Sequence, residues 1–195
     1  MASDDITIAI PAHPARAASG LLHRAIGSAL RQTRPAAGLS LAMDLTRAGA
    51  PATRQRALDQ VITPWVAFLD SDDWLYPDHL ASLMECAEET GADYVYSYWD
   101  TNITPDILGH FGKVFDPASP TETTITVLVR TELAKAVGFK ALEDRESNTG
   151  EDWRMVLGCI DQGANIVHLP KQTWVWSHHG ANTSGMATKG DAANA

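Results

Sequence analysis

The stretch WVAFLDSDDWLYPDHL, residues 65–80, decides how the rest of the sequence is interpreted. It begins with a run that is apolar at every position, a pattern typical of a central strand buried in a parallel sheet. Asp70, Asp72 and Asp73 follow within four positions. So many like charges at one strand end require compensation by a metal ion, by a helix N-terminus or by water. The residues around this stretch help to choose among these three.

Strand-like and helix-like segments alternate on both sides of it. The predicted strands are residues 6–10, 38–45, 64–70, 92–100, 121–130, 165–170 and 172–179. The predicted helices are residues 19–33, 50–62, 76–91, 131–138 and 151–163, with Ser19 as a cap, Pro51 and Pro77 in first turns, and Gly91, Gly138 and Gly163 as stops. This alternation indicates one α/β domain whose sheet is parallel at least in its first half.

Three polar segments fall at the ends of predicted strands: Pro11–Arg16, Asp44 and Asp70–Asp73. In open α/β sheets, ligands bind at the carboxyl ends of the strands. The three segments are therefore expected to form one pocket.

Composition limits the classes of function. The 195 residues are 45% hydrophobic and 20% charged, as in an ordinary globular domain, and the formal charge of −9 argues against a nucleic-acid partner. Cys86 and Cys159 lie in apolar stretches without CxxC spacing and are expected to be buried free thiols. We find no transmembrane segment and no signal peptide, so a cytoplasmic location is expected.

The acidic cluster has several possible explanations. Acids cap helix N-termini, but three exceed what capping requires. An EF-hand loop does not fit, because Ala81 stands where that loop carries its final Glu. Haloacid-dehalogenase-type phosphatases also place Asp-x-Asp at a strand end, but early in the domain and before a Thr, where this chain has Trp74. Mg²⁺ or Mn²⁺ bound by Asp-x-Asp and by substrate phosphates fits better.

The order of motifs resembles that of family-2 glycosyltransferases with the GT-A fold, over roughly residues 5–185. ITIAIPAHPAR (6–16) is similar to the opening strand and loop of that family, LLHRAIGSALRQT (21–33) to its first helix, and AMDL (42–45) to its nucleotide-contacting strand end. Residues 52–80 resemble its arginine-containing helix and metal-binding motif. TGEDW (149–153) resembles the acceptor-side Glu-Asp motif, and HHGANTS (178–184) resembles a late His followed by Ser. The succession of these motifs is more specific than any one of them.

The resemblance implies a single GT-A domain over residues 1–185, with a mixed, mostly parallel sheet flanked by helices and a disordered tail at 186–195. Asp70 and Asp72 would form the Asp-x-Asp pair, with Asp72 as the direct ligand of Mn²⁺ or Mg²⁺. Asp73 would be a helix cap or a second ligand. His179, with His178 as the alternative, would contact the metal or the diphosphate, and Arg54 would face the diphosphate.

The implied donor is a nucleoside-diphosphate sugar, with a UDP-sugar as the first choice. Its binding residues would be Pro11, His13, Arg16 and Asp44 toward the nucleoside, Arg54, Asp70 and Asp72 toward the diphosphate, and Glu151 toward a sugar hydroxyl. The chain departs from the family in two places. DLTRAG (44–49) lacks a second acid after Asp44, and PAHPAR (11–16) replaces a Thr-aromatic-Asn loop.

The implied reaction is an inverting displacement at the anomeric carbon. Asp152, across the site from the metal, would deprotonate the acceptor hydroxyl, while the metal, Arg54 and His179 neutralise the leaving diphosphate. Trp153, Trp174 and Trp176 either stack on sugar rings or belong to the core. Two alternatives remain: a non-catalytic sugar-nucleotide or glycan-binding module, and a metal-dependent phosphatase or nucleotidyltransferase. The sequence does not identify the acceptor.

Overall fold

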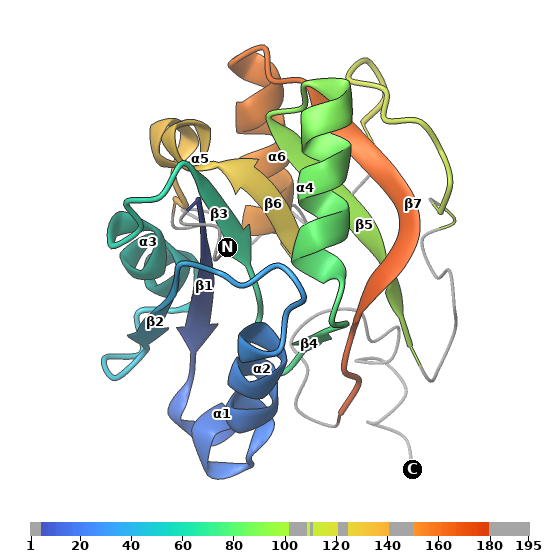
Figure 1. Ribbon diagram of the computed structural model, residues 1–195. Coiled ribbons are helices and arrows are strands. Elements are labelled where there is room, and N and C mark those ends of the chain that lie inside the picture. The colour runs from blue at the N-terminus through green and yellow to red at the C-terminus, as the bar shows by residue number, and fades with distance from the viewer. Residues whose placement is uncertain (1–4, 102–108, 110, 121–124, 141–149, 180–195) are drawn as a thin grey trace, which may run out of the picture.

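The computed structural model describes residues 5–101, 109, 111–120, 125–140 and 150–179. Within these residues the strands form one seven-stranded sheet in the order β2-β1-β3-β6-β5-β7-β4, and helices cover both faces (Figure 1). The strands are β1 (Ile6–Ala12), β2 (Gly38–Met43), β3 (Trp65–Phe68), β4 (Trp74–Leu75), β5 (Tyr94–Asp100), β6 (Val127–Arg130) and β7 (Ile166–Val175). The helices are α1 (Pro14–Ala18), α2 (Leu21–Leu30), α3 (Ala50–Asp59), α4 (His79–Thr90), α5 (Thr131–Val137) and α6 (Glu151–Asp161).

Most strands of this sheet run in the same direction. β1 is parallel to β2 and β3, and β5 is parallel to β7. β6 is antiparallel to both of its neighbours, β3 and β5, and β4 is antiparallel to β7. The prediction of a mixed, mostly parallel sheet is therefore confirmed. β3 is central as expected, although one of its two neighbours is antiparallel.

Alternating strand residues feed two separate hydrophobic cores. Ile6, Ile8 and Ile10 point to the face covered by α2 and α4, whereas Val66 and Phe68 point to the face covered by α3, α5 and α6. The two cysteines are buried free thiols, as expected: Cys86 lies in the first core and Cys159 in the second. Burial raises the pKa of Cys159 to about 12.

Helix α4 shows why the sequence pattern was informative. Leu80, Leu83, Met84 and Ala87 recur at helical spacing and are all buried against the sheet. The helix ends at Gly91, whose φ of 66° lies in the left-handed region that glycine adopts without strain. Its predicted end is therefore confirmed.

Helix α3 is shorter than predicted. It ends at Asp59, so Val61 and Ile62 do not extend its apolar face; Val61 is buried outside the helix, and Ile62 is 94% exposed.

The assignment of Ser19 as a helix cap is wrong. Ser19 closes α1, a short helix that the sequence analysis missed, and its hydroxyl donates to Arg16 O at 3.1 Å. Pro14 occupies the first turn of α1, and His13 Nδ1 accepts a hydrogen bond from Ala15 N at 3.2 Å. Helix α2 then begins after Gly20.

The two predicted late strands are one strand, β7. Pro170 suggested a break, because proline cannot donate to a sheet ladder. The pairing of β5 with β7 is irregular at this point, since the register shifts between Tyr96 and Tyr98. Pro170 lies within that irregularity, so no ladder hydrogen bond is lost.

Two other expectations depend only in part on the described residues. Of the predicted strand 121–130, β6 covers Val127–Arg130, and residues 121–124 lie outside the described part. The expected disordered tail at 186–195 also lies outside it. No described helix has the length and apolar character needed to cross a membrane.

Candidate active site

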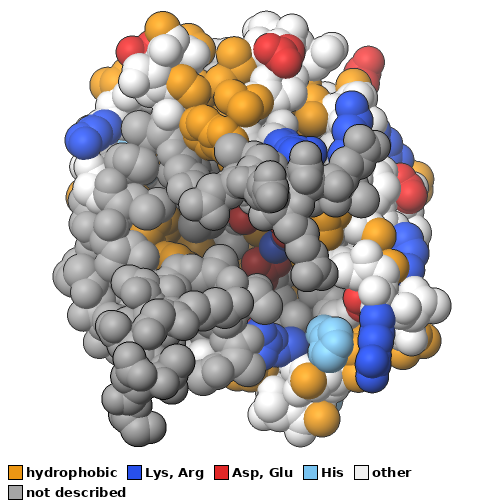
Figure 2. All heavy atoms as spheres, turned by 180° about the vertical axis from the view of Figure 1, so that it is seen from behind, with side chains coloured by type: hydrophobic (Ala, Val, Ile, Leu, Met, Phe, Trp, Pro, Cys, Tyr) orange, Lys and Arg blue, Asp and Glu red, His pale blue; other side chains and the backbone are white. Residues whose placement is uncertain are grey.

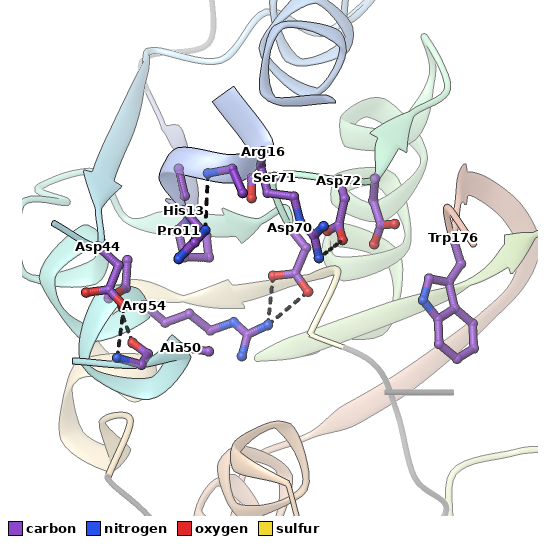
Figure 3. A pocket seen from close by; sticks show the side chains of 15 residues that line it. Pro11, His13, Arg16, Asp44, Ala50, Arg54, Asp70, Ser71, Asp72 and Trp176 are labelled. Carbon is purple, nitrogen blue, oxygen red and sulfur yellow. Dashed lines mark hydrogen bonds and ion pairs between the residues drawn. The ribbon is translucent and has the colours of Figure 1, made fainter. Parts of the chain in front are cut away.

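A pocket of about 420 Å³ lies at the carboxyl ends of β1, β2 and β3. Asp44 lies at one end of it and Trp176 at the other (Figure 3). Viewed from behind, acidic and basic side chains are visible at the bottom of a hollow (Figure 2). The three segments expected to meet do so here, together with Arg54: the pocket is lined by Pro11, His13, Arg16, Asp44, Arg54, Asp70 and Asp72.

The three aspartates after β3 form a compact group. Asp70, Asp72 and Asp73 each offer a ligand atom, and these atoms lie within 4.8 Å of one another. A turn in which Asp73 N donates to Asp70 O at 3.2 Å brings them together. Carboxylate oxygens are the hard ligands that Mg²⁺ and Mn²⁺ prefer, so this donor set fits a divalent cation.

Asp73 does not cap the following helix. The N-cap residue of α4 is Asp78, and Pro77 precedes the helix rather than lying in its first turn. Asp73 Oδ1 instead accepts a hydrogen bond from Ser177 N at 2.8 Å. The capping alternative is therefore wrong.

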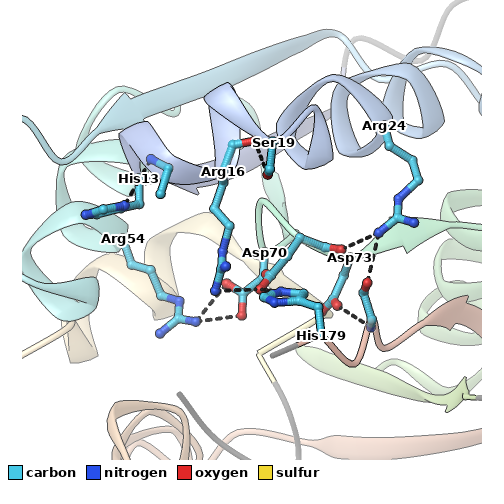
Figure 4. Close-up of polar contacts among 11 residues, drawn as sticks. His13, Arg16, Ser19, Arg24, Arg54, Asp70, Asp73 and His179 are labelled. Atoms are coloured by element: carbon cyan, nitrogen blue, oxygen red, sulfur yellow. Dashed lines mark hydrogen bonds and ion pairs between the residues drawn. The ribbon is translucent and has the colours of Figure 1, made fainter. Parts of the chain in front are cut away.

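Arginines from three helices compensate the aspartate charges (Figure 4). Arg54 Nη2, from α3, donates to both carboxylate oxygens of Asp70, at 2.7 and 2.9 Å. Arg16 Nη2, from α1, lies 3.1 Å from Asp72 Oδ2. Arg24 Nη2, from α2, donates to the main-chain oxygen of Asp72 at 2.9 Å. The repulsion within the cluster is thus offset by side chains distant from it in sequence.

Burial shapes the protonation of this cluster. It raises the pKa of Asp73 well above its ordinary value, and the nearby charge of Asp70 adds to the effect. Burial also raises the pKa of Asp70, although Arg54 opposes this shift. For Arg54 itself burial acts to lower the pKa, but the carboxylates of Asp70, Asp152 and Glu151 outweigh it and raise the pKa. Arg54 is therefore a permanently charged group with carboxylates around it.

The structure distinguishes the two adjacent histidines. His179 Nε2 lies 2.9 Å from Asp72 Oδ2. His178 Nδ1 lies 3.1 Å from Thr101 Oγ1, and its ring packs on Trp176 with centroids 4.6 Å apart. The geometry therefore brings His179, and not His178, to the Asp-x-Asp pair.

The three tryptophans considered as sugar-stacking residues in the sequence, Trp153, Trp174 and Trp176, have different environments. Trp174 is 1% exposed and belongs to the first core. Trp153 is partly buried and packs against the second core. Trp176 lines the pocket, its ring edge-on to Trp99 with centroids 5.3 Å apart. Of these three, Trp176 is the one whose side chain lines the pocket.

Arg54, expected to face the diphosphate, lines the pocket, and its guanidinium is bound by carboxylates. Its Nη1 donates to Glu151 Oε1 and lies 3.3 Å from Asp152 Oδ1, while Nη2 binds Asp70. One guanidinium therefore joins the end of β3 to the first turn of α6. Asp152, expected across the site from the metal, shares this arginine with Asp70.

Asp44 organises the loop after β2. Its two carboxylate oxygens accept hydrogen bonds from Ala48 N at 2.9 Å and Gly49 N at 3.0 Å, and these bonds lower its pKa. Arg56 Nη2 lies 3.7 Å from Asp44 Oδ1. Asp44 therefore holds in place the loop that forms this wall of the pocket, with or without a bound ligand.

Sequence reasoning missed Arg24. Its guanidinium lies 3.8 Å from the centroid of the Trp74 ring and donates to Ser177 Oγ at 2.9 Å. In the sequence it is one basic residue on an amphipathic helix, and nothing in that pattern shows that its side chain reaches the aspartates.

Comparison with solved structures supports this arrangement of elements. S. aureus TarS in complex with UDP-GlcNAc superposes with a TM-score of 0.74 at 17% identity, over 91% of this chain and 60% of that one. The TarS complex with UDP gives 0.71 at 18% identity, over 88% and 60%. The mannosyltransferase PcManGT from Pyrobaculum calidifontis, in complex with GDP-Man and Mn²⁺, gives 0.66 at 13% identity, over 90% and 59%. The chain thus spans about 60% of the length of these structures.

No protein of curated function matches this sequence significantly. The sequence profile described as glycosyl transferase family 2 matches residues 43–147, a segment that contains Asp44, Arg54 and the aspartate cluster. This match covers more than half of the chain. The chain belongs to glycosyl transferase family 2.

Proposed function

We propose that the protein is a metal-dependent inverting glycosyltransferase that transfers a sugar from a nucleoside-diphosphate sugar to an acceptor hydroxyl. The observation that carries this proposal is the compact group Asp70, Asp72 and Asp73, at the strand ends that line the pocket. Membership of the family supports the reaction class. The TarS structures contain UDP and UDP-GlcNAc, so UDP-sugars are the first donors to test.

The donor would lie along the pocket, with its nucleoside toward Asp44 and its sugar toward Trp176. A divalent cation held by Asp72, with Asp70, Asp73 and His179 beside it, would supply positive charge to the departing diphosphate. Pro11 and His13 would border the nucleoside. The ring of Trp176 would pack on the sugar.

Asp152 would accept the proton of the acceptor hydroxyl, and Glu151 would bind a sugar hydroxyl. Both lie in the first turn of α6. Arg54 would act as a positioning residue, because its guanidinium holds both carboxylates next to Asp70. Its contacts support this role better than the diphosphate contact expected from the sequence.

Donor binding can be tested by thermal unfolding with UDP, UDP-GlcNAc and GDP-mannose, each with Mn²⁺ and with a chelator. A ligand that binds only the folded protein raises its Tm, by an amount that follows the ratio of ligand concentration to Kd. We expect a shift with Mn²⁺ that the chelator removes and that Asp72→Asn abolishes. A nucleotide shift that persists in the chelator would refute the metal role.

Catalysis requires a separate test. Asp152→Asn should reduce turnover of the bound donor by about 100-fold or more while leaving donor affinity nearly unchanged. Asp161→Asn, an exposed acid at the other end of α6, is the matched control and should leave both unchanged. Equal loss of donor affinity in Asp152→Asn would make Asp152 a donor ligand. Donor binding without any turnover in the unmodified chain would favour a non-catalytic binding module.

A further inference from the structure

One oxygen atom of the aspartate cluster contacts basic side chains from opposite ends of the sequence. Asp72 Oδ2 lies 3.1 Å from Arg16 Nη2 and 2.9 Å from His179 Nε2. The side chains of Arg16 and Asp72 are only 16% and 17% exposed, so this is not a loose surface pair. A cation bound to this oxygen would meet Arg16.

Arg16 and His179 differ in what they can do when a cation arrives. A neutral imidazole has a lone pair that can bind a metal. A guanidinium has only donors and a permanent positive charge, so a divalent cation on the same carboxylate repels it strongly. His179 can therefore stay beside a cation, whereas Arg16 has to move away.

The surroundings of Arg16 permit this movement. It lies on α1, a helix of five residues of which none is buried. Gly20, with a φ of 82°, separates α1 from the packed helix α2. Arg16 also lines the pocket beside His13, and both lie between Asp44 and Asp72 in the close view of the pocket (Figure 3).

The other two arginines of the site are held more firmly. Arg54 is buried and contacts Asp70, Glu151 and Asp152. Arg24 lies against the ring of Trp74 and has main-chain and hydroxyl partners. Only small movements of these two are compatible with such contacts.

We infer that Arg16 exchanges partners during donor binding: it neutralises Asp72 in the metal-free protein and binds the donor diphosphate once a divalent cation takes its place. This inference rests on the proposed function. A guanidinium presents paired N–H donors that match phosphate oxygens, and the diphosphate would lie between Asp44 and the aspartates. The cation would thus create two features of the donor site at once, its own charge and a released arginine.

The exchange predicts that Arg16→Gln changes the affinity for Mn²⁺ and the affinity for UDP in opposite directions. In Arg16→Gln the cation no longer competes with a guanidinium, so Mn²⁺ affinity without nucleotide should rise about three- to tenfold. UDP affinity at saturating Mn²⁺ should fall about tenfold or more, because a charged hydrogen-bond donor to the diphosphate is lost. Isothermal titration calorimetry measures both on the same protein. Arg31→Gln, at an exposed position after α2, is the matched control and should change neither affinity.

Weaker Mn²⁺ binding in Arg16→Gln would overturn the inference, because Arg16 would then help to form the metal site. Unchanged UDP affinity would overturn it as well. Arg16→Lys keeps the charge but loses the paired donors. It should leave the Mn²⁺ affinity near that of the unmodified protein and lower the UDP affinity. Arg16→Lys serves as the test variant if Arg16→Gln does not fold. Failure of the unmodified protein to bind UDP with Mn²⁺ would refute the proposed function instead, and the Mn²⁺ titration alone would still test the competition.

Discussion

Arg54 offers the most direct test of how the site is held together. Arg54→Gln removes the charge that Asp70, Glu151 and Asp152 share. Breaking a buried ion pair by removing one partner typically costs about 3–5 kcal/mol, and the partial exposure of Asp70 favours the lower end, about 3 kcal/mol. For a domain of this size, about 2–4 °C per kcal/mol gives a fall in Tm of about 6–12 °C.

The stability lost in Arg54→Gln should be greater at high pH than at low pH. Without Arg54, burial and mutual repulsion raise the folded-state pKa of these carboxylates above their unfolded values, as burial already does for Asp70. A carboxyl group with a raised folded pKa favours the folded state at low pH, and this contribution is lost as the pH rises through that pKa. The difference in Tm between Arg54→Gln and the unmodified protein should therefore be larger at pH 8 than at pH 5.

Thermal unfolding followed by circular dichroism at both pH values measures this effect. Arg56→Gln, two positions away on the same helix and much more exposed, is the control and should cost less than about 1 kcal/mol. Adding Asp70→Asn to Arg54→Gln should recover part of the loss, because one uncompensated charge is removed. A fall in Tm below about 2 °C, or the same fall at both pH values, would refute the assignment of Arg54 as the charge that holds the site together.

Two further predictions concern the scaffold. Gly158→Ala places a methyl group 2.4 Å from Val137 Cγ1 and should destabilise the fold by about 1–3 kcal/mol in urea unfolding. Gly27→Ala, which meets only the end of an arginine side chain, should stabilise it by about 0.5–1 kcal/mol. Stabilisation by Gly158→Ala as well would show that the contact between α5 and α6 is not close. Burial lowers the pKa of His79 to about 3, so the unfolded chain binds a proton there that the folded protein does not, and stability should fall by up to about 1.4 kcal/mol per pH unit below about pH 6.5. In His79→Gln this contribution is absent, so the difference in unfolding free energy between variant and unmodified protein should narrow between pH 7 and pH 5; a constant difference would contradict the burial of a neutral imidazole.

Hydrophobic periodicity was sufficient to predict most of the fold. The strand at 64–70 and the helix at 76–91 correspond to β3 and α4, because each buries a face whose apolar spacing is visible in the sequence. The pocket was predictable for a geometric reason, since the carboxyl ends of parallel strands meet at one edge. β4 was not predictable, because a strand of two residues is too short to show any period.

The partners of the aspartates could not be predicted in the same way. Which arginine side chain faces Asp70 or Asp72 depends on how α1 and α3 are rotated on the sheet, and that rotation is set by tertiary packing. Arg54 was expected at the diphosphate because its position in the sequence resembles that of the family, yet its side chain turns toward Glu151. Sequence order thus gave the residues of the site, while their pairing required the structure.

The antiparallel strand β6 divides the sheet into two parts of three strands each, β2-β1-β3 and β5-β7-β4. The first part bears the proposed nucleotide-binding loops, and the second leads to Trp176 and His179. Substitutions on the second part can therefore leave the strand register beneath the nucleotide loops intact. Arg54 is the exception, because its contacts reach from α3 to α6. A substitution of this arginine would therefore disturb both parts of the site at once.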